Sequence, residues 1–185
     1  DSDNDGICYR TYPGTHPEKG AYFTRGTSHD EYARYTEDGN INAETLMRLM
    51  RKFRTASELV PPPIIEINGE DSCGIIYYGS SKPAVLEAKD ILKTKDINVD
   101  LMQIRSFPFN LDVWEFIASH DRIYVVEQNR DSQMRTLIMA EGGISAEILR
   151  PLVHFTGDPI EASYIVNKIS EREVNYKSHK NIKER

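Results

Sequence analysis

A polar stretch between residues 15 and 35 carries the densest group of side chains that could bind or neutralise a charged ligand. Its members are cationic, acidic or imidazole side chains: His16, Lys19, Arg25, His29, Asp30 and Arg34. An arginine or a histidine in this stretch could neutralise a carboxylate or a diphosphate. The same side chains could instead form a polar network with a partner domain. The stretch therefore predicts either a substrate-facing loop or an interface.

Two further places combine an apolar run with a polar corner. The run that ends at Gly79 is followed by Ser80 and Ser81, and backbone N–H groups at such a corner can cradle a phosphate. The chain has no G-x-G-x-x-G and no P-loop lysine there, so helix capping is the stronger interpretation. The run 123–126 leads into Glu127, Asn129 and Arg130, which we expect either to line a ligand crevice or to cap the next helix.

The cysteines offer less chemistry. Cys8 with His16 or His29 would make a nucleophile and a base, but isolated Cys and His residues in a loop are more often incidental. Cys8 and Cys73 are the only cysteines, whereas an iron–sulfur cluster or a structural zinc site needs about four ligands. We therefore expect two free thiols in a reducing compartment.

Composition narrows the class of protein. The 185 residues are 39% hydrophobic and 28% charged, which is typical of a globular protein with a substantial core. A net charge of −6 argues against nonspecific nucleic-acid binding. No apolar run approaches the roughly 20 residues of a membrane span and no signal-peptide pattern is visible, so we expect a cytoplasmic protein. Because the chain opens with Asp1, we also expect a fragment or a processed product.

The first 60 residues hold an aromatic-rich arm and one clear helix. Residues 1–40 contain five tyrosines but no regular apolar period, so this arm is expected to pack on another body of protein. Residues 42–59 predict a helix with Asn42 as its N-cap. Its apolar face is made by Leu46, Leu49, Met50 and Phe53. Prolines 61–63 then predict a stiff boundary.

From residue 64 onwards, strands and helices alternate. We predict strands at 64–67, 75–79, 99–104, 123–126 and 152–155. Helices are expected after Ser80 or Ser81, after Asn110 with Leu111, Trp114 and Ile117 on it, through Met134 to Ile138 and up to Gly142-Gly143, and from Pro159. This alternation predicts a three-layer α/β sandwich with a largely parallel sheet. The charged tail after Ser170 is expected to fray.

Four strings of residues resemble a known family: GTHPEKGAYFTRGTSHDEYARYTEDG, GIIYYGS, RSFPF and DRIYVVEQNRDSQMRTL. Together they are similar to the C-terminal part of the alpha subunit of 2-oxoacid:ferredoxin oxidoreductases, in particular the 2-oxoglutarate type. The resemblance extends to about residue 169. It implies a thiamine-diphosphate enzyme that oxidatively decarboxylates a 2-oxoacid, passes the acyl group to coenzyme A and sends electrons to ferredoxin.

The resemblance also implies a division into domains. Residues 1–60 would be the end of a pyrimidine-binding domain with its connector helix, 61–170 a domain like the transketolase C-terminal domain, and 171–185 a charged tail. The sheet of that domain is mixed and five-stranded, in the order 64–67, 98–104, 75–79, 123–127, 151–155, with the first strand antiparallel. Strands 75–79 and 123–127 would then be neighbours at a topological switch point. Its crevice would be bordered by Gly79, Ser80, Glu127 and Asn129, with Arg130 on the same corner.

The same resemblance implies that the chemistry needs a partner. Thiamine diphosphate, magnesium and the cysteine ligands of an iron–sulfur cluster are expected on the beta subunit, so the chain alone is expected to be inactive and to bind no cofactor. It would act as scaffold and subunit interface. Ser132 stands where the family's corner has glycine, which predicts strain or a different corner. Two alternatives remain open: a self-contained flavodoxin-like module that binds a nucleotide or an anion, and an assembly domain without a ligand.

Overall fold

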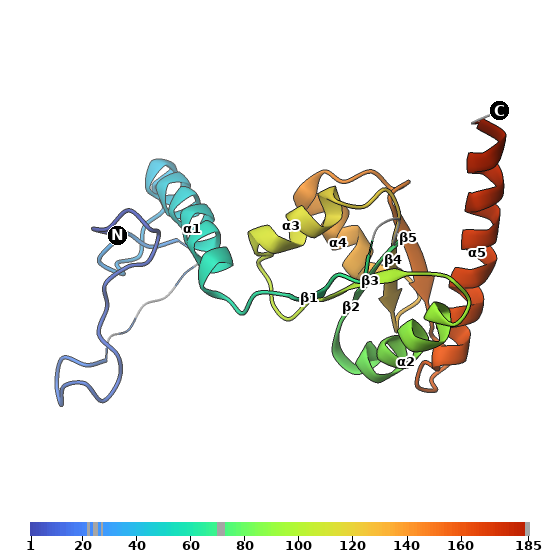
Figure 1. Ribbon diagram of the computed structural model, residues 1–185. Helices are drawn as coiled ribbons and strands as arrows, with labels where there is room; N and C mark the ends of the chain where they lie inside the picture. Colours follow the sequence, from blue (N-terminus) through green and yellow to red (C-terminus); the bar gives the residue numbers. More distant parts are fainter. Residues whose placement is uncertain (22, 24–25, 27, 70–72, 184–185) are drawn as a thin grey trace. The chain divides into compact units, whose positions relative to one another are not determined.

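The computed structural model describes residues 1–21, 23, 26, 28–69 and 73–183, without the side chains of 175 and 177–183 (Figure 1). Within it the chain forms two compact units, Asp1–Val60 and Pro61–Arg185. Each unit is described by itself below. No helix in the described part of the chain is long and apolar enough to cross a membrane.

The first unit is built on one long helix, α1 (Gly39–Leu59). Its N-cap is Asp38, whose carboxylate accepts hydrogen bonds from the N–H groups of Asn40 and Ile41 at 2.8 and 3.4 Å. The prediction of Asn42 as the N-cap was therefore wrong by one turn, because Asp38 has extended backbone and a better placed acceptor. Asn42 instead accepts a hydrogen bond from Ser28 Oγ at 2.8 Å.

The second unit contains a five-stranded sheet. Its strands are β1 (Ile64–Glu66), β2 (Cys73–Tyr77), β3 (Val99–Gln103), β4 (Ile123–Glu127) and β5 (Leu149–Val153). Their spatial order is β1-β3-β2-β4-β5, and β1 is antiparallel to β3 while the other pairs are parallel. The predicted fold class and strand order are confirmed.

Two strands differ from the predicted bounds by two residues or more, and the other three by one residue. β2 begins and ends two residues earlier than predicted, and β5 runs over 149–153 instead of 152–155. The start of β5 was missed in the sequence because Arg150 and Pro151 interrupt its apolar pattern. Ile123 N–H donates to Ile148 O and His154 N–H donates to Glu127 O, so alternate β5 residues face β4 and Pro151 has its missing N–H on the free edge.

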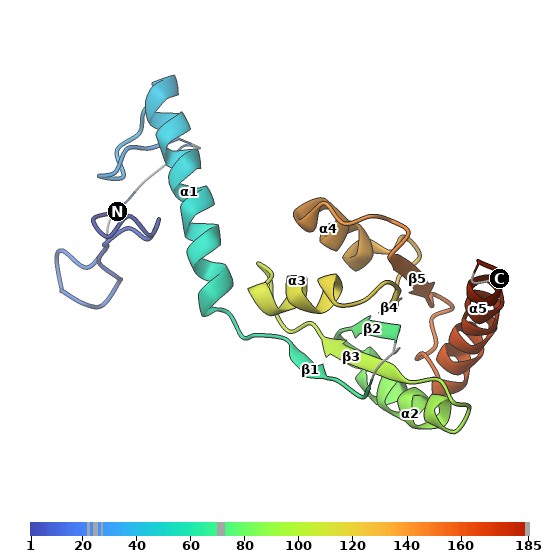
Figure 2. The same cartoon turned by 45° about the horizontal axis from the view of Figure 1, so that its top comes forward.

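Helices cover both faces of this sheet, as Figure 2 shows. They are α2 (Lys82–Lys93), preceded by the short 3₁₀ turn η1 (Gly79–Ser81), and α3 (Leu111–Ala118), α4 (Gln133–Gly142) and α5 (Ala162–Lys183). α2 and α5 pack on one face over Ile75, Tyr77 and Tyr124. α3 and α4 pack on the other face over Ile76 and Val125. Apart from Tyr77, the strand residues named here are fully buried, so the central strands are apolar on both faces.

The helix ends test several residue predictions. Asn110 caps α3 as predicted, by accepting from Asp112 N–H at 3.0 Å. Ser81 stands at the N-cap position of α2 but makes no capping bond, because its backbone is already helical. Leu111 is 66% exposed and does not face the core, since it is the first residue of α3. The predicted end of α4 at the double glycine is confirmed, and Gly143 there has the left-handed conformation common at helix ends.

The tail after Ser170, which we expected to fray, is helical in its described residues. α5 continues to Lys183, and Glu173 within it is 2% exposed. The carboxylate of Glu173 lies 2.9 Å from Nε of Arg122, which is itself buried at the start of β4. A buried ion pair therefore anchors a part of the helix that composition alone suggested was free.

Candidate functional site

The crevice predicted at the ends of β2 and β4 contains a carboxylate that serves the fold. Glu127 ends β4 and is completely buried. Its Oε2 accepts from Met134 N–H at 2.7 Å and its Oε1 accepts from Arg135 N–H at 3.0 Å. Asn129 Nδ2 donates to Oε2 at 2.8 Å. Glu127 thus occupies the anion-binding position at the N-terminus of α4 with the chain's own side chain.

Asn129 and Arg130 complete this corner. Asn129 Oδ1 accepts from the N–H groups of Asp131 and Gln133 at 3.1 and 3.2 Å, which supplies further partners at the start of α4. Arg130 is exposed and pairs with its neighbour Asp131 at 2.7 Å. Ser132 has a φ of 51°, so the predicted unusual backbone at this corner is confirmed. These contacts describe a helix-capping corner with one solvated arginine.

Gln128 joins the two sides of the crevice. Its Nε2 donates to Ser80 Oγ at 2.9 Å and to Ser81 Oγ at 3.3 Å, and its Oε1 accepts from Ile160 N–H at 3.3 Å. Gly79 beside it has a φ of 57° and open space at the position of a Cβ. Sequence reasoning had not singled out Gln128. The signal that could have found Gln128 is its position directly after the end of β4, between Glu127 and Asn129, which were both predicted site residues.

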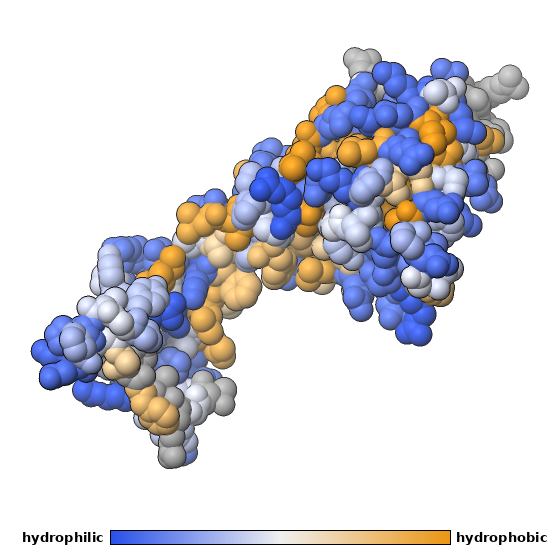
Figure 3. Space-filling view, turned by 90° about the horizontal axis from the view of Figure 1, so that it is seen from below, coloured by the Kyte–Doolittle hydropathy of each residue, from blue (hydrophilic) through white to orange (hydrophobic). Residues whose placement is uncertain are grey.

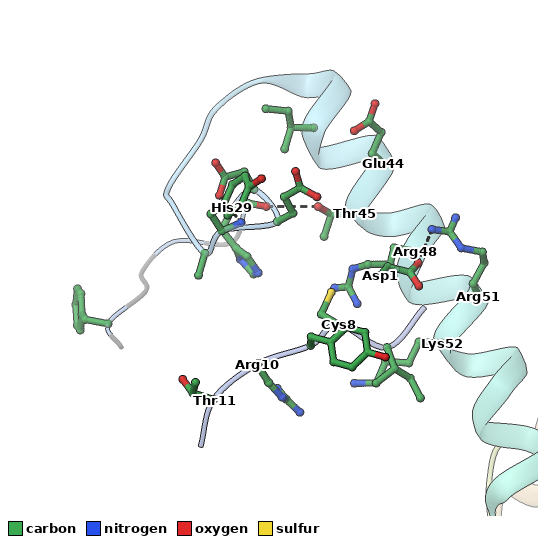
Figure 4. Close-up of a pocket in the computed structure, with 18 residues that line it drawn as sticks. Asp1, Cys8, Arg10, Thr11, His29, Glu44, Thr45, Arg48, Arg51 and Lys52 are labelled. Atoms are coloured by element: carbon green, nitrogen blue, oxygen red, sulfur yellow. Dashed lines mark hydrogen bonds and ion pairs between the residues drawn. The ribbon is translucent and has the colours of Figure 1, made fainter. Parts of the chain in front are cut away.

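The first unit holds a pocket of about 790 Å³, shown in Figure 4. Its walls come from residues 1–11, from 29–33 and from one side of α1. His29 and Asp30 of the predicted loop lie on this lining. Sequence reasoning did not connect them with the cationic side chains opposite, which are Arg48, Arg51 and Lys52 on α1 and Arg10.

The α1 wall of this pocket is held to the first residues of the chain. Arg48 Nη1 donates to Gly6 O at 2.8 Å, and Arg51 Nη2 pairs with Asp1 Oδ2 at 2.8 Å. Gly6 has a φ of 85°, and a Cβ there would lie 2.2 Å from Lys52 N, so only glycine permits this close approach. Arg48 and Arg51 therefore already use part of their hydrogen-bonding capacity to hold residues 1–6.

The remaining residues of the predicted loop make local contacts. His16 Nδ1 accepts from Glu18 N–H and Lys19 N–H at 3.1 and 3.0 Å. Asp30 Oδ1 accepts from Arg34 N–H at 2.9 Å, and the Arg34 guanidinium lies over the ring of Tyr32. Arg25 lies outside the described residues. A substrate-facing role for this loop stays a prediction.

Thiols and metal-ligating groups are dispersed. Both cysteines are free, and burial, with a smaller effect of Glu173, raises the pKa of Cys73 to about 12. Among the residues that the structure describes, no three His, Cys, Asp or Glu side chains are grouped so as to hold a metal ion. Two cysteines are too few to bind an iron–sulfur cluster without further ligands.

The comparison with curated proteins places the chain among known sequences. It is 28% identical over 155 residues to 2-oxoacid:ferredoxin oxidoreductase 2, subunit alpha, of Aeropyrum pernix, and this match covers 79% of the chain. The chain is therefore similar in sequence to such alpha subunits. The corresponding alpha subunit of Saccharolobus solfataricus is also 28% identical, over 64% of the chain. The resemblance seen in the sequence is confirmed. No family model matches the chain.

The alpha subunits are much longer than this chain. It spans 24% of the Aeropyrum subunit and 20% of the Saccharolobus subunit. Among solved structures, a 2-oxoglutarate:ferredoxin oxidoreductase from Magnetococcus marinus, determined with 2-oxoglutarate, coenzyme A and succinyl-CoA bound, superposes with a TM-score of 0.76. That match covers 90% of this chain and 29% of the other, at 24% identity, and it shows the same fold.

Proposed function

We propose that the chain is the C-terminal part of the alpha subunit of a thiamine-diphosphate-dependent 2-oxoacid:ferredoxin oxidoreductase. The carrying observation is the match to two alpha subunits over most of this chain. The complete enzyme would decarboxylate its 2-oxoacid oxidatively, transfer the acyl group to coenzyme A and reduce ferredoxin. 2-Oxoglutarate is the favoured substrate, because the solved enzyme of the same fold carries it.

Within that enzyme, the second unit would be a transketolase C-terminal-like brace. This role is supported by the way its polar corners are used: Glu127 caps α4, and Gln128 ties η1 to the segment before α5. A crevice whose polar groups already bind one another has little capacity left for a nucleotide. The first unit would be the end of the pyrimidine-binding domain, with residues 15–35 turned towards substrate or a partner domain.

The cofactors would be supplied elsewhere. Thiamine diphosphate, magnesium and the iron–sulfur cluster are assigned to other parts of the enzyme, chiefly a beta subunit, because the family resemblance implies them there and two cysteines are too few for a cluster. That subunit, ferredoxin and coenzyme A are the proposed partners, in the cytoplasm.

The test is reconstitution. The complete alpha subunit, co-expressed with the proposed beta subunit, should reduce ferredoxin when 2-oxoglutarate and coenzyme A are supplied together, and should lose this activity when either is omitted. The chain 1–185 alone should give no turnover and no iron–sulfur absorbance. Turnover by the isolated chain, or none by the reconstituted enzyme with any of several 2-oxoacids, would show the assignment to be wrong.

A further inference from the structure

The described residues of the first unit form no hydrophobic core of their own. Among its described residues, Gly6 and Gly20 are the only buried ones, and neither has a side chain. Every buried apolar residue of the described chain belongs to the second unit. A unit of this size gains too little from burying apolar surface to order itself alone, so some other body of protein must complete it.

The missing contact can be placed on one face of α1. An α-helix turns about 100° per residue, so Leu46, Met50 and Phe53 lie on one stripe with Leu49 at its margin. These four side chains are 54%, 59%, 55% and 37% exposed. We name this the α1 stripe. Figure 3 shows in orange the hydrophobic residues that reach the surface on one face of the chain.

The opposite face of α1 is already occupied. Arg48 and Arg51 bind Gly6 and Asp1, and Thr55 Oγ1 donates to Asp5 O at 2.5 Å. These residues lie about half a turn from the centre of the α1 stripe. The unit thus uses the polar side of α1 to hold its own N-terminal residues and leaves the apolar side uncovered. A helix with one polar and one apolar face of this kind is typical of an element that packs between two other parts of a protein.

We infer that the α1 stripe is the docking face for the part of the same alpha-subunit polypeptide that lies outside this chain. This inference rests on the proposed function. Both curated alpha subunits extend far beyond the matched part, which is 24% of one and 20% of the other. A unit with no core needs a permanent partner, and another segment of the same polypeptide is always present beside it. A transient partner would leave the unit without a core for much of the time.

Two methionines make the test direct. Met50 lies on the α1 stripe and Met47 lies about a quarter turn away from its centre. They are 59% and 57% exposed, so peroxide should oxidise them at similar rates in the chain 1–185. In the complete alpha subunit, oxidation of Met50 should slow by about tenfold and that of Met47 by less than about threefold, as followed by mass spectrometry. Equal reactivity of Met50 in both proteins would overturn the inference.

Substitutions give a second measurement. Met50→Lys should lower the melting temperature of the complete subunit by about 5 °C or more and leave that of the chain 1–185 unchanged, because the lysine is buried only in the former. Met50→Leu should be neutral. Met47→Lys is the matched control and should shift neither protein by more than about 1 °C. If Met50→Lys has no larger effect than Met47→Lys in the complete subunit, the inference is wrong.

The remaining outcomes separate this inference from its rivals. Protection of Met50 that rises with the concentration of the chain 1–185 alone would identify a second copy as the occupant and overturn the inference. A reconstituted enzyme that turns over 2-oxoglutarate while Met50 stays reactive would refute the docking face and leave the proposed function standing. Protection of Met50 in a reconstituted enzyme without any turnover would support the docking face and refute the proposed activity.

Discussion

Glu173 on α5 and Arg122 at the start of β4 form a buried ion pair, in which Nε of Arg122 lies 2.9 and 3.2 Å from the two carboxylate oxygens. Tyr124 OH also donates to Glu173 Oε1 at 2.8 Å. Arg122 additionally donates from Nη1 to Asp121 at 2.8 Å. A carboxylate taken from water in this way is stabilised only while its donors stay in place.

Glu173→Gln should therefore destabilise the second unit strongly. The substitution leaves Arg122 buried with less than its full compensating charge, and we expect a loss of about 3 kcal/mol in the free energy of unfolding. Urea titration of the chain followed by circular dichroism measures it. Glu171→Gln, at an exposed position on the same helix, is the control and should change the free energy by less than about 0.5 kcal/mol. Equal effects of the two substitutions would mean that α5 is not anchored by this pair.

Glu127→Gln tests the corner at the N-terminus of α4. An amide keeps one acceptor oxygen for the N–H groups of Met134 and Arg135, but loses the charge that favours the positive end of the helix. We expect a loss of about 2 kcal/mol, since the group is buried and makes charge-assisted hydrogen bonds. Glu141→Gln near the exposed C-terminal end of α4 should be neutral or slightly stabilising. A stability unchanged by Glu127→Gln would leave this carboxylate available for a ligand.

The sheet could be predicted because its signals are local and strong. β2 and β4 are buried throughout and apolar except for Glu127 at the end of β4, and the change to helical spacing after each one is abrupt. β5 was harder, because Arg150 and Pro151 interrupt the apolar pattern, and the tolerance of Pro151 depends on the strand lying at an edge. Strand order across the sheet came from the resemblance to a family and not from periodicity.

The polar contacts could not be predicted in the same way, because they join residues that are far apart in sequence. Gln128 bonds to Ser80, and Glu173 bonds to Arg122. Whether a charged residue in a helix is solvated or buried depends on its pairing partner, and composition does not reveal that partner. For the same reason His29 and Asp30 were recognised as polar loop residues, whereas the pocket they share with Arg48 and Arg51 was not.

Ser132→Gly should stabilise the protein. Ser132 has a φ of 51°, a conformation that costs a residue with a Cβ about 1 kcal/mol relative to glycine. We expect a gain of about 0.5–1 kcal/mol in the free energy of unfolding after the entropic cost of glycine is subtracted. Ser163→Gly within α5 is the matched control and should lose about 0.5 kcal/mol. A loss at both positions would contradict the left-handed assignment of Ser132.

The two cysteines should differ sharply in reactivity. Burial raises the pKa of Cys73 to about 12, from a usual value of 9.0, and its side chain has no exposed surface. Cys8 is partly exposed. At pH 8, iodoacetamide should therefore alkylate Cys8 within minutes to hours and Cys73 only when the chain unfolds. Mass spectrometry of peptides identifies which thiol has reacted, and the Cys8→Ser variant should take up no label without denaturant.

The same raised pKa fixes the direction of a pH dependence. In the unfolded chain Cys73 loses its proton near pH 9, whereas in the folded protein it keeps the proton until about pH 12. The unfolded state then binds fewer protons than the native state, so the free energy of unfolding falls as the pH rises from about 9 to 12. Cys73→Ala removes this contribution while it creates only a small cavity, and should flatten the alkaline slope in urea titrations. A slope identical to that of the unsubstituted chain would mean that Cys73 is not a thiol held neutral by its surroundings.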